Sequence, residues 1–586
     1  MRLFILTLLL GLLIGCANVS DSQTNNFTTL NNTNPIGSEI SPISPNTTLP
    51  VIAIHISEKS QKHWDDEPLS RKFEGYASLM VLLDSQKIPY VVLSDEDIGK
   101  EKLFINKKIK YPIVFSINNP QTTTHVVNEI DRYVQAGGTF FFNANSLTFN
   151  KCFMLDVDLS CIREFFKTDT VMKVKAHPLL SHIPNREFTW PAAHVVAMVD
   201  SEHTYMTNSR KNNSGSMVVI DGGYIYHSSF RPFWGRAQGN PTSINTFFAM
   251  NAIKSSFESH GVPFLQIEPW GNYSAAFTQR FDVEAPLKEL LEVFPLFVDV
   301  SESYNIPAVF YMLVDQVEYA TYGDISGWEV FRLKGPRISE MVLDARDRGM
   351  VIGSHSTWHL GPDVDPNPKK NIEQSLKILE EVLGERPDEW VSPNLLAQKH
   401  SSLKIIDELG IKTTGDQMIG FLPFFGLSPD GGSRFKALQL PTSHTLHDLK
   451  TAPDFLAFSL DHQTPRSIQQ TVDQYYNHNG LINIYAHVKS KSVSKLEYLY
   501  NYVQSKENVW IATPDEIYDY WITYDKLSIE DVRMNGEMLQ FTLANSGKET
   551  TAYFDLPGQM YVNQEKSDGS VTLGKERVMI TVNLSE

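Results

Sequence analysis

Two histidines four residues apart place the strongest constraint on how this chain can fold. The spacing in Gly353-Ser354-His355-Ser356-Thr357-Trp358-His359 predicts that both imidazoles lie on one side of a helical turn and hold one metal ion. About 70 residues earlier, an apolar strand pattern that begins at Phe277 ends in two carboxylates, Asp282 and Glu284. A hydrolytic metal site needs two histidines, a carboxylate and open positions for water and substrate. The fold must therefore bring the strand end and the histidine pair together.

The beginning of the chain has the pattern of an export signal. A basic start is followed by an uncharged apolar run. The alternative is a plain membrane-spanning helix, for which the run is too short. The run closes on Leu13-Ile14-Gly15-Cys16, which resembles a bacterial lipobox. We predict a signal peptide over 1–15, lipidation of Cys16 and a disordered tether over 16–49. Ala17 is similar to the residue found in lipoproteins passed to an outer membrane, so we expect an exported lipoprotein of the cell envelope, at the outer membrane.

Length, charge and cysteine content limit the remaining chain. About 540 residues exceed what a single hydrophobic core holds, so we expect about three domains. A formal net charge of −17 argues against a nucleic-acid partner, because phosphate binding requires a basic face. Cys152 and Cys161 are either a disulfide, which would persist outside the cytoplasm, or two buried thiols.

Residues 50–265 alternate between strand and helix patterns in the first half, which predicts a parallel α/β layer. The pattern resembles flavodoxin-like or glutamine-amidotransferase-like domains that accompany some carbohydrate-active enzymes. The second half is richer in β-forming residues and continues the same accessory domain. No glycine-flanked nucleophile follows Phe115-Ser116, so we expect no catalysis here. Expected strands are 51–56, 90–93, 112–117 and 139–143, and expected helices are 73–84, 122–135 and 243–260.

Residues 266–523 carry a series of motifs that resembles the polysaccharide deacetylase (NodB-homology) family of carbohydrate esterases. Arg280-Phe281-Asp282-Val283-Glu284 is similar to the family's Thr-Phe-Asp-Asp, and Ser354-His355-Ser356-Thr357-Trp358-His359 to its His-Ser/Thr-x-x-His. The other matches, in family order, are Ile306 to Tyr311, Gly384 to Asn394, Gly480 to His487 and Asn508 to Ile517. The family's fold is a distorted (β/α) barrel, in which sites gather at the carboxyl ends of the strands.

The resemblance implies a role for each motif residue. Glu284, His355 and His359 would bind a divalent metal, and the family resemblance implies that this metal is zinc. Asp282 would be the general base, and His487 would protonate the leaving nitrogen.

The chain departs from the family at several positions. Val391 stands where the family has an arginine that steers the base, and Arg280 is our candidate substitute, with a strand-end arginine paired to a surface acid as the alternative. Glu284 replaces an aspartate and is one methylene longer. Trp390 and Tyr485 are candidates to line or support the acetyl pocket. The carboxylate partner of His487 is either Asp454 or Asp461.

Residues 524–586 show short alternating runs between turn signals, which predicts a small β-sandwich-like domain. The whole chain is thus expected to be a multidomain α/β protein that removes N-acetyl groups from an extracellular or cell-wall amino-sugar polymer. Its partners would be that acetylated polysaccharide and a membrane. The alternatives are a non-catalytic glycan-binding lipoprotein on a degenerate deacetylase scaffold and an O-deacetylase of an exopolysaccharide.

Overall fold

In the computed structural model, all described residues belong to one compact unit, Ser38–Glu586. Predictions for the signal peptide, for Cys16, Cys152 and Cys161, and for Asp454 fall outside the described residues. The structure describes residues 48–60, 76, 78–117, 119, 121–143, 242–284, 287–314, 336–427, 433–443 and 459–585, and the strands alone between 143 and 242.

A nine-stranded sheet forms the first part of the unit, in the order β2-β1-β5-β6-β13-β12-β11-β8-β9. The first five strands in this order run parallel, and the remaining pairs are antiparallel, as expected for an α/β layer with a β-rich continuation. The strands are β1 (Ile52–His55), β2 (Tyr90–Leu93), β5 (Ile113–Ser116), β6 (Thr139–Asn143), β8 (Thr170–Val174), β9 (Glu187–Trp190), β11 (Thr204–Asn208), β12 (Asn213–Ile220) and β13 (Gly223–Ser228).

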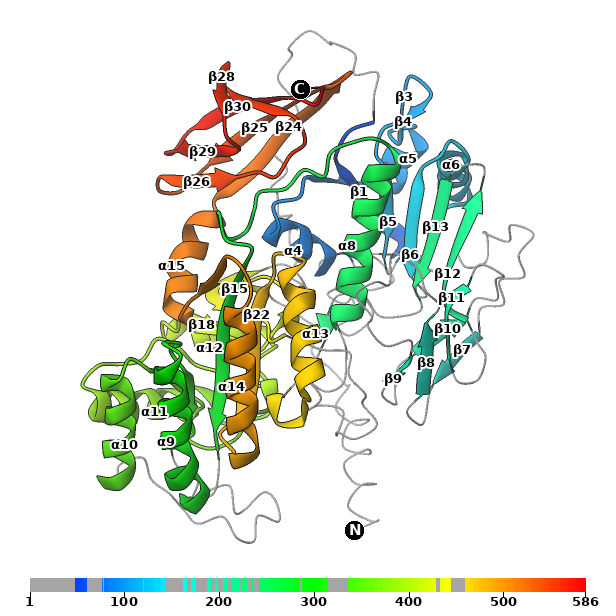
Figure 1. Cartoon of the computed structure of the whole chain (residues 1–586). Coiled ribbons are helices and arrows are strands. Elements are labelled where there is room, and N and C mark those ends of the chain that lie inside the picture. Colours follow the sequence, from blue (N-terminus) through cyan, green and yellow to red (C-terminus); the bar gives the residue numbers. More distant parts are fainter. Residues whose placement is uncertain are drawn as a thin grey trace. The chain divides into compact units, whose positions relative to one another are not determined.

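Helices accompany this sheet, and Figure 1 shows α6 and α8 beside its strands. A capping box between Ser94 and Asp97 starts the short helix α5, which the sequence did not predict. Neither did the sequence predict the hairpin of β3 and β4. The elements are α4 (Ser78–Ser85), α5 (Asp95–Gly99), α6 (Thr124–Gln135), α8 (Thr242–Ser259), β3 (Phe104–Ile105), β4 (Lys108–Ile109), and the pair β7 (Ile162–Phe165) with β10 (Val195–Met198).

A buried polar network joins the carboxyl ends of β1 and β5. The His55 Nδ1 atom lies 3.0 Å from Ser116 Oγ, and His55 Nε2 lies 2.9 Å from Asp95 Oδ1. Asn119 donates to both the His55 carbonyl and Ser116 Oγ, at 2.7 and 2.8 Å. His55 and Ser116 have no exposed surface. A serine that a substrate cannot reach is no nucleophile in this conformation, so we assign the network a structural role.

The central part of the unit is a ring of mostly parallel strands. Hydrogen-bonded neighbours run β17-β16-β15-β22, and β23 also pairs with β15. Single bridges Ser354↔Trp390 and Glu389↔Thr413 continue the ring to β18 and β21. The Ser443 amide donates to the Asn483 carbonyl at 2.7 Å, which brings the segment after β21 back to β22. The strands are β15 (Ala275–Val283), β16 (Val309–Met312), β17 (Val351–Ser354), β18 (Thr413–Thr414), β20 (Phe424–Leu427), β21 (Arg434–Gln439), β22 (Leu481–His487) and β23 (Val509–Ile511), with β14 (Trp234–Gly235) paired to β19 (Met418–Ile419).

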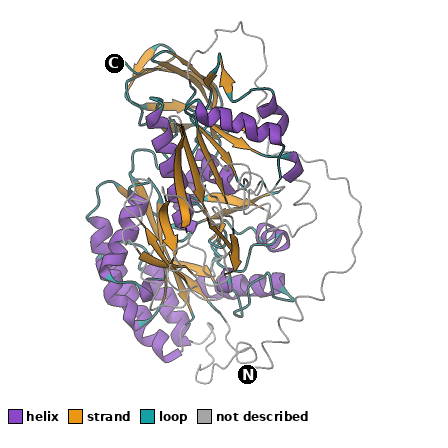
Figure 2. Ribbon diagram, turned by 90° about the vertical axis from the view of Figure 1, so that its right-hand side faces the viewer, coloured by secondary structure: helices purple, strands orange, loops and turns teal. Residues whose placement is uncertain are grey.

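The helices of this part lie outside the strands, as the predicted (β/α) arrangement requires (Figures 1 and 2). Proline at the first turn starts α13 and α15, where Thr464 and Thr513 each form a capping box. The helices are α9 (Leu287–Ser303), α10 (Pro336–Asp347), α11 (Pro368–Leu383), α12 (His400–Glu408), α13 (Pro465–Tyr476), α14 (Ser490–Gln504) and α15 (Pro514–Tyr524), with short 3₁₀ turns η4 (Pro393–Leu395) and η7 (Leu460–His462).

The last part consists of antiparallel strands. Five form one sheet in the order β24-β25-β30-β27-β28, and β26 pairs with β29 in a separate ladder. Buried and less buried residues alternate along β25 and β30, the pattern of sheets with one face on a core. The strands are β24 (Leu527–Asn535), β25 (Met538–Asn545), β26 (Thr550–Tyr553), β27 (Gln559–Val562), β28 (Glu565–Ser567), β29 (Ser570–Leu573) and β30 (Arg577–Asn583).

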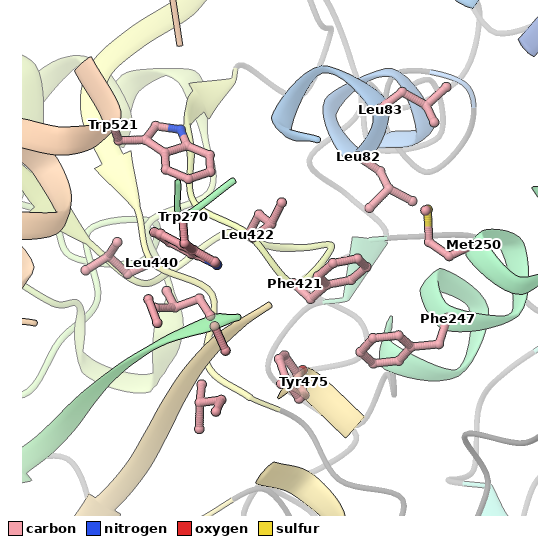
Figure 3. Close-up of a cluster of buried hydrophobic side chains, with 14 of the residues drawn as sticks. Leu82, Leu83, Phe247, Met250, Trp270, Phe421, Leu422, Leu440, Tyr475 and Trp521 are labelled. Atoms are coloured by element: carbon pink, nitrogen blue, oxygen red, sulfur yellow. The ribbon is translucent and has the colours of Figure 1, made fainter. Parts of the chain in front are cut away.

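Aromatic side chains hold the core beside the barrel strands together (Figure 3). The Phe247 ring of α8 stacks on Phe421 with centroids 5.0 Å apart and meets Tyr475 of α13 edge-on at 5.4 Å. Trp270 packs against Trp521 of α15 at 5.2 Å. Such pairs contribute about 0.5–1.5 kcal/mol each beyond the area they bury.

Candidate active site

The sequence motifs meet at the carboxyl ends of three strands of the parallel run β17-β16-β15-β22. Asp282 lies at the end of β15 and Glu284 directly follows that strand, His355 directly follows β17, and His487 ends β22. In the pairing of β15 with β22, Asp282 stands opposite His487 and Arg280 opposite Tyr485. Register partners in a sheet project to the same face, so all four side chains point to one side. This convergence is what the sequence predicted from the order of motifs.

The expected helical turn at the histidine pair is wrong. His355 to His359 form an irregular loop after β17, and Ser356 has a φ of 76°, outside the helical region. Asn371 of α11 holds the loop, because its side-chain oxygen accepts the amides of Thr357 and Trp358 at 2.9 and 3.0 Å. The imidazoles still approach each other, with ring centroids 5.4 Å apart.

Three side chains form a candidate metal site: Glu284, His355 and His359. One ligand atom from each lies within 4.8 Å of the others, and this is the one such group of histidine, cysteine and acidic residues found in the described part of the chain. Glu284 Oε2 is 2.6 Å from His359 Nε2 and 3.7 Å from His355 Nε2. The short contact is a hydrogen bond, so a metal that took both atoms would displace the proton between them.

The hydrogen bonds of His355 fit a metal ligand. Its Nδ1 lies 3.1 Å from the Val391 carbonyl, which can only accept, so Nδ1 carries the proton and Nε2 presents a lone pair. Nε2 is buried without a hydrogen-bond partner, and its nearest acidic oxygens, on Asp282 and Glu284, lie at 3.6 and 3.7 Å. A lone pair that faces two carboxylates is unfavourable unless a cation lies between them. A carbonyl on the other ring nitrogen is the usual outer partner of a metal-bound histidine.

Asp282 is held by a buried arginine. Arg280 Nε and Nη2 donate to its two carboxylate oxygens, both at 2.8 Å, and the two residues are 2% and 3% exposed. The planar fork of the guanidinium fixes both oxygens of the carboxylate. In the structure Arg280 thus pairs with the buried Asp282 and not with a surface acid. Val391 is buried and packs with Val309 and Tyr311.

His487 has a carboxylate on each side. Its Nδ1 lies 3.0 Å from Asp461 Oδ2, and its Nε2 lies 2.7 Å from Glu284 Oε1. Burial alone would lower the pKa of His487, but the hydrogen bonds with Asp461 and Glu284 raise it to about 9. Burial would likewise raise the pKa of Asp461, yet His487 and Ser492 lower it to about 2. Of the two carboxylates that the sequence left open, Asp461 is thus the partner within the described residues.

The longer arm of Glu284 lets its two oxygens reach both His359 and His487. Burial alone would raise the pKa of Glu284, but the charge of His359 and the hydrogen bonds of the surrounding histidines lower it well below its usual value. The side chain is therefore an anion at neutral pH, as a metal ligand must be.

The other two candidates occupy different positions. Trp390 is fully buried and donates from its indole to Ser356 Oγ at 3.1 Å, so it supports the histidine loop instead of lining an open pocket. The hydroxyl of Tyr485 lies 2.9 Å from His487 Nε2, within the site.

Sequence reasoning missed two supporting residues. Ser492 donates to Asp461 at 2.6 Å, and Asp416 is a buried carboxyl whose electrostatic neighbours include Arg280. No local signal marks either residue, because both act through contacts far apart in the chain.

Comparisons with known proteins agree with the motifs. Residues 279–414 match the family model for polysaccharide deacetylase, a span that contains Asp282, Glu284, His355 and His359 but not His487. No curated protein matches the chain. A solved putative polysaccharide deacetylase from Mycobacterium smegmatis is 19% identical, with 42% of this chain and 90% of that chain covered and a TM-score of 0.32. A probable polysaccharide deacetylase from Pseudomonas aeruginosa PAO1 is 16% identical over 42% and 91%, also with a TM-score of 0.32. A CE4 family pseudoenzyme from Bacillus anthracis is 12% identical over 43% and 67%, with a TM-score of 0.28.

Proposed function

We propose that this chain, whose residues 279–414 match the polysaccharide deacetylase family, is a metal-dependent hydrolase that removes N-acetyl groups from an amino-sugar polymer. The observation that carries the proposal is the unpaired lone pair of His355 Nε2, which faces Asp282 and Glu284 beside His359. Next to this cluster lie the base Asp282, paired with Arg280, and the acid His487, paired with Asp461.

His355, His359 and Glu284 would hold a divalent cation, and zinc suits two imidazoles and one carboxylate. Such an ion supplies Lewis acidity and a more acidic bound water. The base and the acid of the reaction are each supplied by a residue of this chain.

Asp282 accepts the proton of the attacking water. Its two hydrogen bonds to Arg280 fix the orientation of the carboxylate, and its Oδ2 lies 3.6 Å from the ligand atom of His355. The base thus stands close enough to the ligand cluster to reach a water held there.

His487 donates a proton to the leaving nitrogen. With Nδ1 on Asp461 and a pKa of about 9, the imidazole is cationic at neutral pH, and Nε2 faces the ligand cluster. An amine leaves as a neutral group only when it is protonated, so an amide substrate uses this acid more fully than an ester does.

Acetate release from N-acetylated chito-oligosaccharides tests the proposal. The wild type should lose activity with a chelator and regain it with zinc, and Asp282→Asn should bind zinc without turnover. If zinc-loaded wild type releases no acetate from any N-acetylated glycan, the proposal is wrong. Release from O-acetylated polymers alone would favour the ester reaction, and glycan binding without turnover would favour the non-catalytic alternative.

We propose further that a lipid on Cys16 attaches the protein to the outer membrane of the cell envelope. No helix in the described part of the chain has the length and apolar character to cross a membrane. A coil of about 30 residues after Cys16 would give a reach of about 30 Å. Cys16→Ser should release soluble, active protein from membranes, and wild type without acyl mass would contradict the anchor.

A further inference from the structure

Two pairs of side chains line the barrel face of β15 and β22. Arg280 stands opposite Tyr485, and two residues further along Asp282 stands opposite His487. Alternate residues of a strand share a face, so both pairs project toward the ligand cluster. The outer pair contains the proposed base and acid, and the inner pair lies directly beneath it.

Tyr485 contacts the acid His487 and also Arg280, the arginine that binds the base. Its hydroxyl lies 2.9 Å from His487 Nε2, the nitrogen that faces the reaction site. Its ring lies under the guanidinium of Arg280, with 5.4 Å from Cζ to the ring centroid. A buried guanidinium over an aromatic face is stabilised by the ring quadrupole. One side chain therefore touches the acid directly and the base through its arginine.

The hydroxyl of Tyr485 shares Nε2 of His487 with a carboxylate oxygen. Glu284 Oε1 lies 2.7 Å from this nitrogen, and Asp461 Oδ2 lies 3.0 Å from Nδ1 on the other side of the ring. Tyr485 thus adds a neutral contact to the two carboxylates that hold the imidazole in place.

The setting of Arg280 connects Val391 with Tyr485. A second ring, that of Tyr311, lies 6.0 Å from its Cζ, and Val391 packs against Tyr311. The family pattern has an arginine where this chain has Val391. Here the arginine comes from β15 instead, and Tyr485 supplies the ring on which it rests.

We infer that Tyr485 is a positioning residue that holds the acid His487 and the arginine of the base in one arrangement. The inference rests on the proposed deacetylase function. It predicts that the hydroxyl acts on His487 and the ring on Arg280, so two substitutions separate the effects.

The experiment measures acetate release by zinc-loaded full-length variants. Tyr485→Phe removes the hydroxyl alone and should lower kcat about tenfold, with KM changed less than about twofold and the zinc content unchanged. Tyr485→Leu also removes the ring and should lower kcat about a hundredfold. Tyr500→Phe is the matched control. Its buried hydroxyl bonds at 2.8 Å to Gln279, which projects from the opposite face of β15 to Arg280, so the substitution should leave kcat unchanged.

A double-mutant cycle tests the ring. In an Arg280→Lys background, Tyr485→Leu should cost several-fold less in kcat than in the wild type, because both changes disrupt one contact. Wild-type kcat in Tyr485→Phe, or additive effects in the cycle, would overturn the inference while the deacetylase function stands.

The inference remains testable if the wild type releases no acetate. That result would contradict the proposed function alone, and the same cycle is then measured by urea unfolding. Non-additive stability changes for Arg280→Lys with Tyr485→Leu, against additive ones for Arg280→Lys with Tyr500→Phe, would support the arrangement. Additive changes in both cycles would overturn it.

Discussion

Replacing Arg280 with lysine tests whether the fork of the guanidinium, and not its charge, orients the base. Lysine keeps the positive charge, but its single ammonium cannot make both 2.8 Å bonds to Asp282. Losing one hydrogen bond to a charged group costs about 1.5–3 kcal/mol. At about 1.4 kcal/mol for each factor of ten, kcat/KM should fall about 10- to 150-fold. Alanine is less informative, because an unpaired buried carboxylate costs about 3–5 kcal/mol of stability.

The assay is the initial rate of acetate release over a range of substrate concentrations, with zinc content and melting temperature measured on the same samples. Arg348→Lys is the matched control, because Arg348 also binds several acids, Asp299 and Glu302 among them, but outside the site. Its activity should remain within about twofold of the wild type, as for most surface ion pairs. A comparably small change in Arg280→Lys would refute the reasoning.

Three further perturbations follow from the structure. Asp461→Asn removes one of the two carboxylate charges that raise the pKa of His487 to about 9, so the alkaline limit of activity should move to lower pH, which a pH profile of kcat measures. An unchanged limit would assign that titration to another group. Burial raises the pKa of Asp416 to about 7, although Arg280 and Thr414 lower it. The contribution of Asp416 to stability is therefore complete below 3.8, its pKa in the unfolded chain, and is lost as the pH rises toward 7. Asp416→Asn should remove this pH dependence, so that between these two pH values its free energy of unfolding in urea gains about 4 kcal/mol relative to the wild type. Parallel pH curves of stability for the two proteins would contradict the assignment. Asp95→Ala leaves His55, Ser57 and Thr122 without their carboxylate and should cost about 3 kcal/mol in urea unfolding without loss of deacetylase activity. A loss below about 0.5 kcal/mol would show that the network is not structural.

The sequence predicted those elements best whose signal is local. Tyr90–Leu93 and Thr139–Asn143 are continuous β-forming runs between turn residues, and both have the predicted bounds. β22 likewise ends at His487, as its motif indicated. The helix α5 was missed because five residues are too few for a periodic pattern to show.

Features that depend on distant contacts could not be predicted in the same way. The spacing of His355 and His359 suits a helix, but the loop takes its hydrogen bonds from Asn371 instead of from its own backbone. The sequence offered two carboxylates for His487, and the choice depends on the bridge between Ser459 and Tyr485, which brings Asp461 to the end of β22. The motifs thus indicate the reactive side chains of a site, while the residues that hold those side chains come from distant segments that only the fold brings together.

The charges of the site explain why its parts occur together. Arg280 neutralises Asp282, and the protonated His487 stands between two anions, Asp461 and Glu284. Two imidazoles that bind a metal are neutral, so the described side chains leave one negative charge in excess. A divalent cation held by these ligands would change this to one positive charge in excess, in a site largely closed to water. Amide hydrolysis develops one negative charge on the carbonyl oxygen in the transition state, and an environment with one opposite charge stabilises that state more than it stabilises the neutral substrate. The same count explains the cost of losing Arg280: with the metal bound the site would then carry no net charge, and the excess positive charge that stabilises the transition state would be lost.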